Sequence, residues 1–235
     1  MNQVALITGG AKRIGKSICL YLAKNHYDII FTYHTSTQEA NQLQSTLTQI
    51  GIKAIAIKWD FSKPANLDLL YKKIEKHFPK IDLLINNAAI FFPDNIKTFN
   101  YKNLYQLLLV NTFSPLLLTH HQILHNPKSH IISILDNRIA FHDKNYISYS
   151  LSKKFLQQGL LHFTALSPPQ CRLNAIAPAA IVAPCNQRDI TISGSKKLKN
   201  INREEQLISA IDFFLKNSYI NGETLFLDGK TRFSF

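Results

Sequence analysis

The sequence contains a tyrosine and a lysine four residues apart, Tyr149 and Lys153, whose chemistry is complementary. On a helix this spacing places the two side chains on the same face, one turn apart. A phenol has a pKa of about 10 and is a weak acid or base near neutral pH until a neighbouring cation stabilises its phenolate. The lysine supplies such a cation and can also reach a ribose hydroxyl of a bound nucleotide. The pair therefore predicts a catalytic acid, although an exposed tyrosine and lysine on a helix surface would have the same spacing.

A second site is predicted where the apolar run 4–7 ends in the segment 8–15, which reads TGGAKRIG. Glycine lets a turn bend tightly and approach a pyrophosphate, whose charge is favourable at the N-terminus of the following helix. Because this turn lies between an expected strand and an expected helix, it has the context that dinucleotide binding requires. A purely structural turn is the alternative. The predicted cofactor contacts in the turn are Gly9, Arg13, Ile14 and Gly15.

The choice between the two nicotinamide cofactors depends on the residues that follow the second apolar run, 28–33. An acidic residue at this point hydrogen-bonds the adenosine ribose of NAD, whereas a phosphate on that ribose requires cations or neutral donors. Here the residues are His34, Thr35 and Ser36, and Arg13 lies in the nearby glycine turn. The sequence therefore predicts NADPH as the cofactor.

The adenine ring is expected near Asp60 and Phe61, which follow the third apolar run. The carboxylate of Asp60 could accept a hydrogen bond from the adenine amino group. The same side chain could instead cap the helix that follows, because aspartate is a preferred N-cap residue.

Apolar runs alternate with stretches of helical spacing along the chain. The expected strands cover 4–7, 28–33, 54–57, 81–85, 131–135, 172–176 and 224–227. The expected helices cover 14–23, 37–50, 67–78, 102–125, 149–164 and 203–215. Strands that alternate with helices indicate a parallel sheet covered on both faces. We therefore expect an α/β fold, a single Rossmann-type doubly wound parallel sheet with helices on both faces, in one catalytic domain over 1–235.

The composition narrows the class of protein further. Of the 235 residues, 46% are hydrophobic and 18% are charged, which is typical of a globular chain. No signal peptide or membrane span is indicated, so a cytoplasmic protein without membrane contact is expected. The net charge of +12 could reflect a nucleic acid, an acidic partner or only a basic surface. Because the lysines are dispersed, we expect no nucleic-acid binding, and the three cysteines without paired spacing indicate no metal site.

Over essentially its whole length the sequence resembles the short-chain dehydrogenase/reductase family. The matching segments are 8–15, Asp60, 86–89 (NNAA), Asn111 with Pro115, Tyr149 with Lys153, 174–178 (NAIAP) and 221–229. The resemblance implies that Asn111 supports a proton relay through water, that the segment after Pro178 closes over the nicotinamide, and that the protein is a homotetramer. The further residues that it places beside the cofactor are Asn87, Ala88, Ala89, Lys153, Pro178 and Ile181.

Two departures from the usual family pattern resemble pteridine reductases and the related bacterial dihydromonapterin reductases. The middle glycine of the turn is replaced by Arg13, and the usual serine, thirteen residues before Tyr149, is replaced by Asp136. In those enzymes the arginine lies near cofactor phosphate and pterin, and the aspartate works with the tyrosine in delivering a proton. Phe91 matches the aromatic residue that stacks on the pterin ring. Phe91 and Phe92 could instead pack as ordinary core or lid residues.

These features predict an NADPH-dependent reductase that converts a dihydropterin, similar to dihydromonapterin or dihydrobiopterin, to its tetrahydro form. The expected catalytic residues are Tyr149, Lys153, Asp136 and Asn111, and the expected substrate contacts are Arg13, Phe91, Asp136 and Tyr149. One alternative is a carbonyl reductase such as a 3-oxoacyl-carrier-protein reductase, whose acidic partner would suit the basic charge. Such enzymes normally have serine in place of Asp136. An alternative of another class is an NADPH-sensing regulatory protein without turnover, against which the intact Tyr149 and Lys153 argue.

Overall fold

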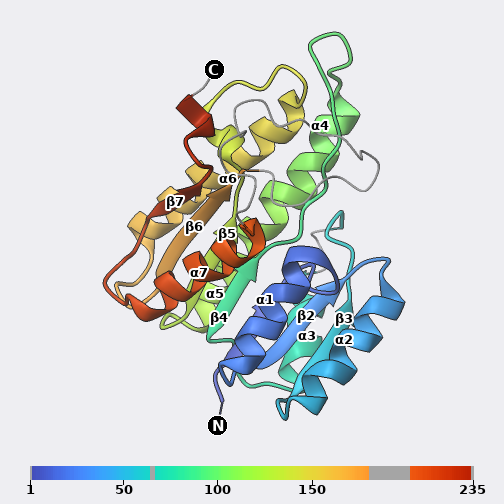
Figure 1. The fold of residues 1–235 in the computed structure, drawn as a ribbon, viewed down its shortest axis with the longest axis vertical. Helices are drawn as coiled ribbons and strands as arrows, with labels where there is room; N and C mark the ends of the chain where they lie inside the picture. The colour runs from blue at the N-terminus through green and yellow to red at the C-terminus, as the bar shows by residue number, and fades with distance from the viewer. Residues whose placement is uncertain (1, 64–66, 180–201, 234–235) are drawn as a thin grey trace.

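The computed structural model describes residues 2–63, 67–179 and 202–233, and its framework is a seven-stranded parallel sheet (Figure 1). The strands are β1 (Val4–Ile7), β2 (Asp28–Tyr33), β3 (Ala54–Lys58), β4 (Leu83–Asn86), β5 (His130–Ile134), β6 (Arg172–Pro178) and β7 (Thr224–Leu227). Their order across the sheet is β3-β2-β1-β4-β5-β6-β7, and every neighbouring pair is parallel. Each strand overlaps one of the apolar runs expected to form strands.

Helices cover both faces of this sheet (Figure 1). Helices α1 (Arg13–Lys24), α2 (Thr37–Gln49) and α7 (Arg203–Lys216) pack on one face. Helices α3 (Leu67–Glu75), α5 (Ser114–His125) and α6 (Ile147–Leu166) pack on the other, and α4 (Tyr101–Leu108) contacts α6. The doubly wound α/β fold expected from the sequence is therefore confirmed.

Strand β1 illustrates how one apolar run contributes to both layers. Alternate side chains of a strand point to opposite faces of the sheet. Ala5 and Ile7 accordingly enter the hydrophobic cluster beneath α1, α2 and α7, whereas Val4 and Leu6 enter the cluster beneath α3 and α5. All four side chains are buried. This burial on both faces explains why the strand reads as continuous hydrophobic residues without an alternating pattern.

The long helix expected over 102–125 is divided into three parts in the structure. Helix α4 ends at Leu108, a π-helical segment η2 occupies Leu109–Phe113, and α5 begins at Ser114. The spacing of apolar residues did not reveal this interruption, because a single π turn is a local irregularity within an otherwise helical run. The irregular turn contains Asn111, one of the predicted catalytic residues.

Other boundaries differ by a few residues from the expected ones. Strand β4 begins at Leu83, and α6 begins at Ile147, before the tyrosine at which the helix was expected to start. Of the helices in 2–63, 67–179 and 202–233, none combines the length and apolar character needed to cross a membrane. The expected cytoplasmic location is a separate matter and stays a prediction.

Candidate active site

The predicted site residues follow the carboxyl ends of the central strands. Gly9 follows β1, Asn87 follows β4 and Asp136 follows β5, and these three strands are neighbours in the sheet. The strand order reverses at β1, since β2 and β3 lie to one side of it and β4 to β7 lie to the other. In doubly wound folds a ligand binds beside such a reversal, at the carboxyl ends of the strands. The topology therefore brings these predicted residues together at the carboxyl ends of the central strands, where a ligand is expected.

Hydrogen bonds join the glycine turn to the segment after β4. The Thr8 hydroxyl oxygen accepts from the backbone N–H groups of Asn87 and Ala88, each at 2.9 Å. The Asn87 side chain donates to the carbonyls of Thr8 and Gly9 at 2.8 and 3.1 Å. Gly9 has a φ of 67°, and its N–H donates to Thr32 Oγ1 at 3.1 Å. Asn87 therefore holds the turn in place, in addition to its predicted contact with the cofactor.

The turn has the close packing and the charge that a pyrophosphate requires. A Cβ atom on Gly15 would lie 2.2 Å from the Gly9 carbonyl oxygen, so this position needs glycine. Helix α1 has no acidic residue in its first turn, which leaves its N-terminus favourable to an anion. Arg13 has a φ of 54°, in the left-handed region that favours glycine, so the arginine is held there at a conformational cost. Ile14 packs against the core beneath the turn.

The segments after β2 and β3 meet where the adenosine end of the cofactor is expected. His34 Nε2 lies 3.9 Å from Asp60 Oδ2. Asp60 Oδ1 accepts from the Ser62 hydroxyl at 2.7 Å and from the Ser62 N–H at 2.9 Å. The hydrogen bond from the hydroxyl holds the pKa of the Asp60 carboxyl below its usual range. Asp60 therefore closes a local turn onto Ser62, and the residues between this turn and α3, 64–66, lie outside the described part of the chain.

The other residues predicted near the adenosine differ in their accessibility. Thr35 is exposed, and its carbonyl accepts from the Thr37 N–H at 3.0 Å. Ser36 is buried at the start of α2. Phe61 packs in the core, and its carbonyl accepts from Ser114 Oγ at 2.8 Å. Any contact of Phe61 with a cofactor would therefore involve its backbone. Of the three residues Thr35, Ser36 and Phe61, only Thr35 has an exposed side chain.

Tyr149 and Asp136 form the centre of the candidate site. The Tyr149 hydroxyl donates a hydrogen bond to Asp136 Oδ2 at 3.1 Å, and both residues are buried. Tyr149 lies in the first turn of α6, whereas Asp136 follows β5 and caps the short 3-10 helix η3 (Asn137–Ala140). The fold thus brings the tyrosine hydroxyl and a carboxylate together, as proton delivery by the two residues requires.

Lys153 lies one helical turn beyond Tyr149 and is buried. Its Nζ donates to the Ile134 carbonyl, at the end of β5, at 2.8 Å. Burial lowers the pKa of Lys153 from 10.5 to about 8, and the charge of Asp136 partly opposes this change. The lysine therefore releases its proton at mildly alkaline pH.

The pKa of Tyr149 differs from the expectation that the neighbouring lysine stabilises a phenolate. Burial raises this pKa well above 10, the charge of Asp136 raises it further, and Arg138 acts in the opposite direction. The physical reason is first that burial disfavours the charged phenolate, and then that the neighbouring charge is the Asp136 carboxylate, while the lysine ammonium group binds a backbone carbonyl. Tyr149 therefore keeps its proton in this state and is a weaker acid than a phenol in water.

Asn111 is completely buried in the π-helical segment between α4 and α5. Its side-chain oxygen accepts from the Ile90 N–H at 2.9 Å. Its amide group donates to the Ile90 carbonyl at 3.0 Å and to the Ser152 hydroxyl at 3.2 Å. Asn111 thereby joins the segment after β4 to the helix that carries Tyr149, and π turns are frequent at functional sites. Its role in a proton relay stays a prediction.

Aromatic rings form one wall of the site. Phe91 stacks on Tyr146 with ring centroids 4.6 Å apart and meets Tyr149 edge-on, also at 4.6 Å. Phe91 is 40% exposed, so it is not an ordinary core residue and part of its ring is accessible. A flat ligand could therefore stack on Phe91 close to the Tyr149 hydroxyl.

Sequence reasoning missed three residues that hold the site together, Asp94, Asp143 and Tyr146. Asp143 Oδ2 accepts a hydrogen bond from Arg138 Nε at 2.7 Å. Asp94 is buried and accepts from the Ser148 N–H at 3.1 Å and from the Ser148 hydroxyl, which satisfies donors in the first turn of α6. Nothing local marks Asp94, because its partner lies 54 residues further along the chain. Tyr146 is the N-cap residue of α6, and its position three residues before Tyr149 is the signal in the sequence that could have identified it.

The remaining predicted residues have different outcomes. Ala89 is exposed beside the site, and Pro178 is the buried last residue of β6. Ile181 lies outside the described residues, as does most of the segment expected to close over the nicotinamide. Within the described parts of the chain, no group of three histidine, cysteine or acidic residues is placed to hold a metal ion.

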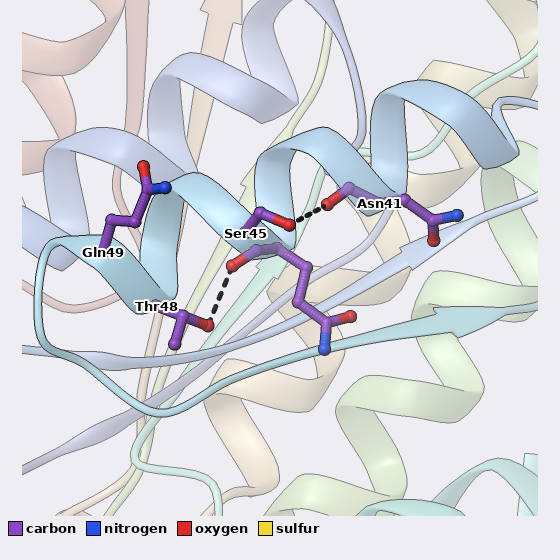
Figure 2. Close-up of a pocket in the computed structure, with 5 residues that line it drawn as sticks. Asn41, Ser45, Thr48 and Gln49 are labelled. Atoms are coloured by element: carbon purple, nitrogen blue, oxygen red, sulfur yellow. Dashed lines mark hydrogen bonds between the residues drawn. The ribbon is translucent and has the colours of Figure 1, made fainter.

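A different concave region lies along helix α2 (Figure 2). Its lining residues are Asn41, Gln44, Ser45, Thr48 and Gln49. Two of its hydroxyl groups donate to carbonyls of the same helix, Ser45 to Asn41 at 3.1 Å and Thr48 to Gln44 at 3.0 Å. Helix α2 packs on β2 and β3, near one edge of the sheet, and this lining contains only amides and hydroxyls. The region therefore has no counterpart to Asp136, Arg138 and Lys153, the charged residues around Tyr149.

The chain belongs to the short chain dehydrogenase family, whose model matches residues 3–191. That span includes the glycine turn, Asn111, Asp136, Tyr149 and Lys153. The family resemblance expected from the sequence motifs is confirmed, and the protein is an oxidoreductase of this family.

Relatives that match nearly the full chain have different named activities. Glucose 1-dehydrogenase 2 of Bacillus subtilis is 25% identical, over 97% of this chain and 94% of its own. Dihydromonapterin reductase of Citrobacter koseri is 26% identical, over 95% of this chain and 94% of its own. The crystal structure of FolM alternative dihydrofolate reductase 1 from Brucella canis, complexed with NADP, has a TM-score of 0.86 and 24% identity and covers 100% of this chain and 95% of that chain. The last comparison supports the fold of this chain, and the substrates belong to the relatives.

Proposed function

We propose that the protein is an NADPH-dependent reductase that converts a dihydropterin, similar to dihydromonapterin or dihydrobiopterin, to its tetrahydro form. The observation that carries this proposal is the hydrogen bond from the Tyr149 hydroxyl to Asp136, beside the accessible ring of Phe91. A carboxylate can accept hydrogen bonds from the N–H groups of a pterin, whereas a ketone has no such donor to offer. Relatives named dihydromonapterin reductase and alternative dihydrofolate reductase support the same class of substrate.

Each residue of the site has a definite role under this proposal. When bound, NADPH supplies the hydride that reduces a C=N bond. Tyr149 holds a proton on its hydroxyl oxygen, hydrogen-bonded to Asp136 before the substrate binds, and donates it to the ring nitrogen. Phe91 offers a ring face on which the pterin stacks, and Arg13 contacts both the pterin and a cofactor phosphate. Residues 1–235 act as one catalytic domain.

The cofactor preference has its own test. Because His34 and Thr35 are exposed and residues 34–36 contain no carboxylate, a ribose phosphate meets no acidic side chain in the segment directly after β2, and Lys12 and Arg13 add positive charge in the glycine turn. A hydrogen bond to a charged group contributes about 1.5–3 kcal/mol, so NADPH should bind at least about tenfold more tightly than NADH. Fluorescence titration of both cofactors measures this ratio, and equal dissociation constants would contradict the preference.

The substrate is tested by following NADPH oxidation with a panel of compounds. The panel contains dihydromonapterin, dihydrobiopterin, dihydrofolate, a quinonoid dihydropterin and an acetoacetyl thioester. We expect the highest kcat/KM with one of the dihydropterins. A preference for the thioester would favour a carbonyl reductase, and NADPH binding without oxidation by any compound would favour a sensing protein.

We further propose that the protein is a homotetramer. Phe113, Leu117 and Leu124 are exposed along η2 and α5, and Phe155 and Leu166 are exposed along α6. Within each set the spacing of four or eleven residues places the side chains on one helical face. Exposed apolar stripes of this kind mark interfaces between proteins. Light scattering coupled to gel filtration should give four times the mass of one chain, 26.8 kDa, and a monomer would contradict this proposal.

A further inference from the structure

Arg138 lies where several segments around Tyr149 meet. Its backbone N–H donates to Asp136 Oδ1 at 2.9 Å, and its Nη1 lies 3.2 and 3.3 Å from the two oxygens of Asp136. Its Nε donates to Asp143 Oδ2 at 2.7 Å. The Ser150 hydroxyl, on α6, donates to the Arg138 carbonyl at 3.2 Å. The guanidinium group therefore binds two carboxylates while the backbone of Arg138 is held by the helix that carries Tyr149.

The same guanidinium group also packs on the aromatic wall of the site. Its central carbon lies 5.5 Å from the ring centroid of Phe91 and 5.0 Å from that of Tyr146. A planar guanidinium can stack on a ring and bind carboxylates through its edge at the same time, which a lysine ammonium group cannot do. Arg138 thus fixes Asp136 and Phe91 relative to each other, in addition to the contacts that both make with Tyr149.

The carboxylate of Asp136 needs this second contact to be held in one orientation. A backbone N–H fixes one oxygen only and leaves the plane of the carboxylate free to turn, since the terminal torsion of aspartate is broad. The Nη1 contacts to both oxygens determine that plane. Oδ2 then faces the Tyr149 hydroxyl, which donates to it.

We propose that Arg138 is a positioning residue for proton transfer, which aims the Asp136 carboxylate at the Tyr149 hydroxyl and sets Phe91 beside them. This inference rests on the proposed function, because it assumes that reduction takes place at Tyr149. With two carboxylates bound to its guanidinium group, Arg138 acts through Asp136 and does not contact the substrate. Its loss should consequently lower kcat and leave KM nearly unchanged.

The test compares Arg138→Gln and Arg138→Lys with a matched control, Lys154→Gln. Lys154 is a cation on α6 whose Nζ donates to the Phe141 carbonyl at 2.8 Å, in the same loop region, without a contact to Asp136. We expect Arg138→Gln to lower kcat about 10- to 100-fold, the scale of a small misplacement of reacting groups, with KM and the Kd of NADPH within about twofold. Arg138→Lys should recover only part of the loss, and Lys154→Gln should stay within about twofold of the wild type.

A further variant, Arg138→Ala, distinguishes positioning from a structural role. Guanidinium chloride at low, non-denaturing concentration should restore part of its kcat, while sodium chloride at equal ionic strength should not. Unchanged kcat in Arg138→Gln would overturn the proposal. A loss of kcat that is accompanied by an equal loss of NADPH affinity, and that guanidinium does not reverse, would also overturn it.

Crystal structures of the wild type and Arg138→Gln give a readout that does not depend on the substrate. The variant should lose the hydrogen bond between Tyr149 and Asp136, and a carboxylate that keeps its position would contradict the inference. If the wild type reduces no dihydropterin but reduces the acetoacetyl thioester, the proposed function fails and the kcat comparison is made with the thioester. If the wild type reduces neither, the two crystal structures decide.

Discussion

Replacing Tyr149 with phenylalanine removes one oxygen atom from the buried centre of the site. The variant keeps the ring that contacts Phe91 but cannot donate to Asp136. We expect kcat to fall by at least about 10²-fold, the scale of general acid catalysis, with the Kd of NADPH nearly unchanged. Steady-state kinetics and fluorescence titration measure the two quantities. Near-normal turnover would mean that another group donates the proton.

A substitution of Asp136 distinguishes the proposed pterin reductase from the alternative, a carbonyl reductase. Asp136→Ser removes the carboxylate that accepts from Tyr149 and that binds Arg138. Dihydropterin reduction should fall about 10²-fold, and NADPH affinity should hold, since the role we propose for Asp136 is toward the substrate. Under the carbonyl-reductase alternative, reduction of the acetoacetyl thioester should hold steady or rise. Both activities are measured on the same purified variant, and unchanged pterin reduction would leave Asp136 with a structural role only.

Lys153 makes the stability of the cofactor-free protein depend on pH. Its pKa is about 8 when buried, against 10.5 in water, so between these values the unfolded chain binds more protons at this position than the folded chain. The free energy of unfolding therefore rises with pH across this window, and the cost of burying the charged lysine, about 3 kcal/mol, is present in full below pH 8. Urea unfolding of the wild type and Lys153→Met between pH 7 and 10.5 measures the effect. The wild type should gain stability relative to the variant as pH rises, and a constant difference would contradict the buried charge.

At the scale of elements, the start of α6 depends on a residue from a distant segment. Asp94 accepts from the N–H and hydroxyl of Ser148, so Asp94→Ala should lower the free energy of unfolding by about 1–2 kcal/mol. Because Tyr149 is the next residue, kcat should fall as well. Asn202→Ala is the control, since Asn202 Oδ1 caps α7 by accepting from two backbone N–H groups. The control should lose similar stability without a loss of kcat, and equal kinetic losses in both variants would refute a specific role for Asp94.

The same contact explains which element boundaries could be predicted from the sequence. The Tyr149–Lys153 spacing predicted the helix correctly, but α6 begins earlier, at Ile147. Helix ends depend on their caps, and here the capping side chain comes from 54 residues earlier in the chain. The π turn around Asn111 was missed for a similar reason, because Asn111 bonds to Ile90 and Ser152, which lie far from it in sequence.

At the scale of the whole molecule, the fold was predictable because strands buried on two faces leave continuous apolar runs. The order of these runs and the intervening helices was sufficient to indicate the doubly wound sheet. The glycine turn and the Tyr149–Lys153 pair were predictable because each is local in sequence. The contact of Arg138 with Phe91, and the burial that raises the pKa of Tyr149, arise only when distant segments pack together.

The left-handed backbone of Arg13, at a φ of 54°, has a consequence for laboratory evolution of the enzyme. Glycine or asparagine adopts this conformation with less strain, so Arg13→Gly and Arg13→Asn should raise the thermal midpoint by about 2–4 °C. A library selected for heat resistance alone should therefore become rich in these two variants. A library selected for turnover at limiting NADPH should keep the arginine, since the role we propose for its charge is to assist phosphate binding. Sequencing both pools measures the difference. Glycine or asparagine in both would mean that the strained turn brings no catalytic advantage, and arginine in both would contradict the expected gain in stability.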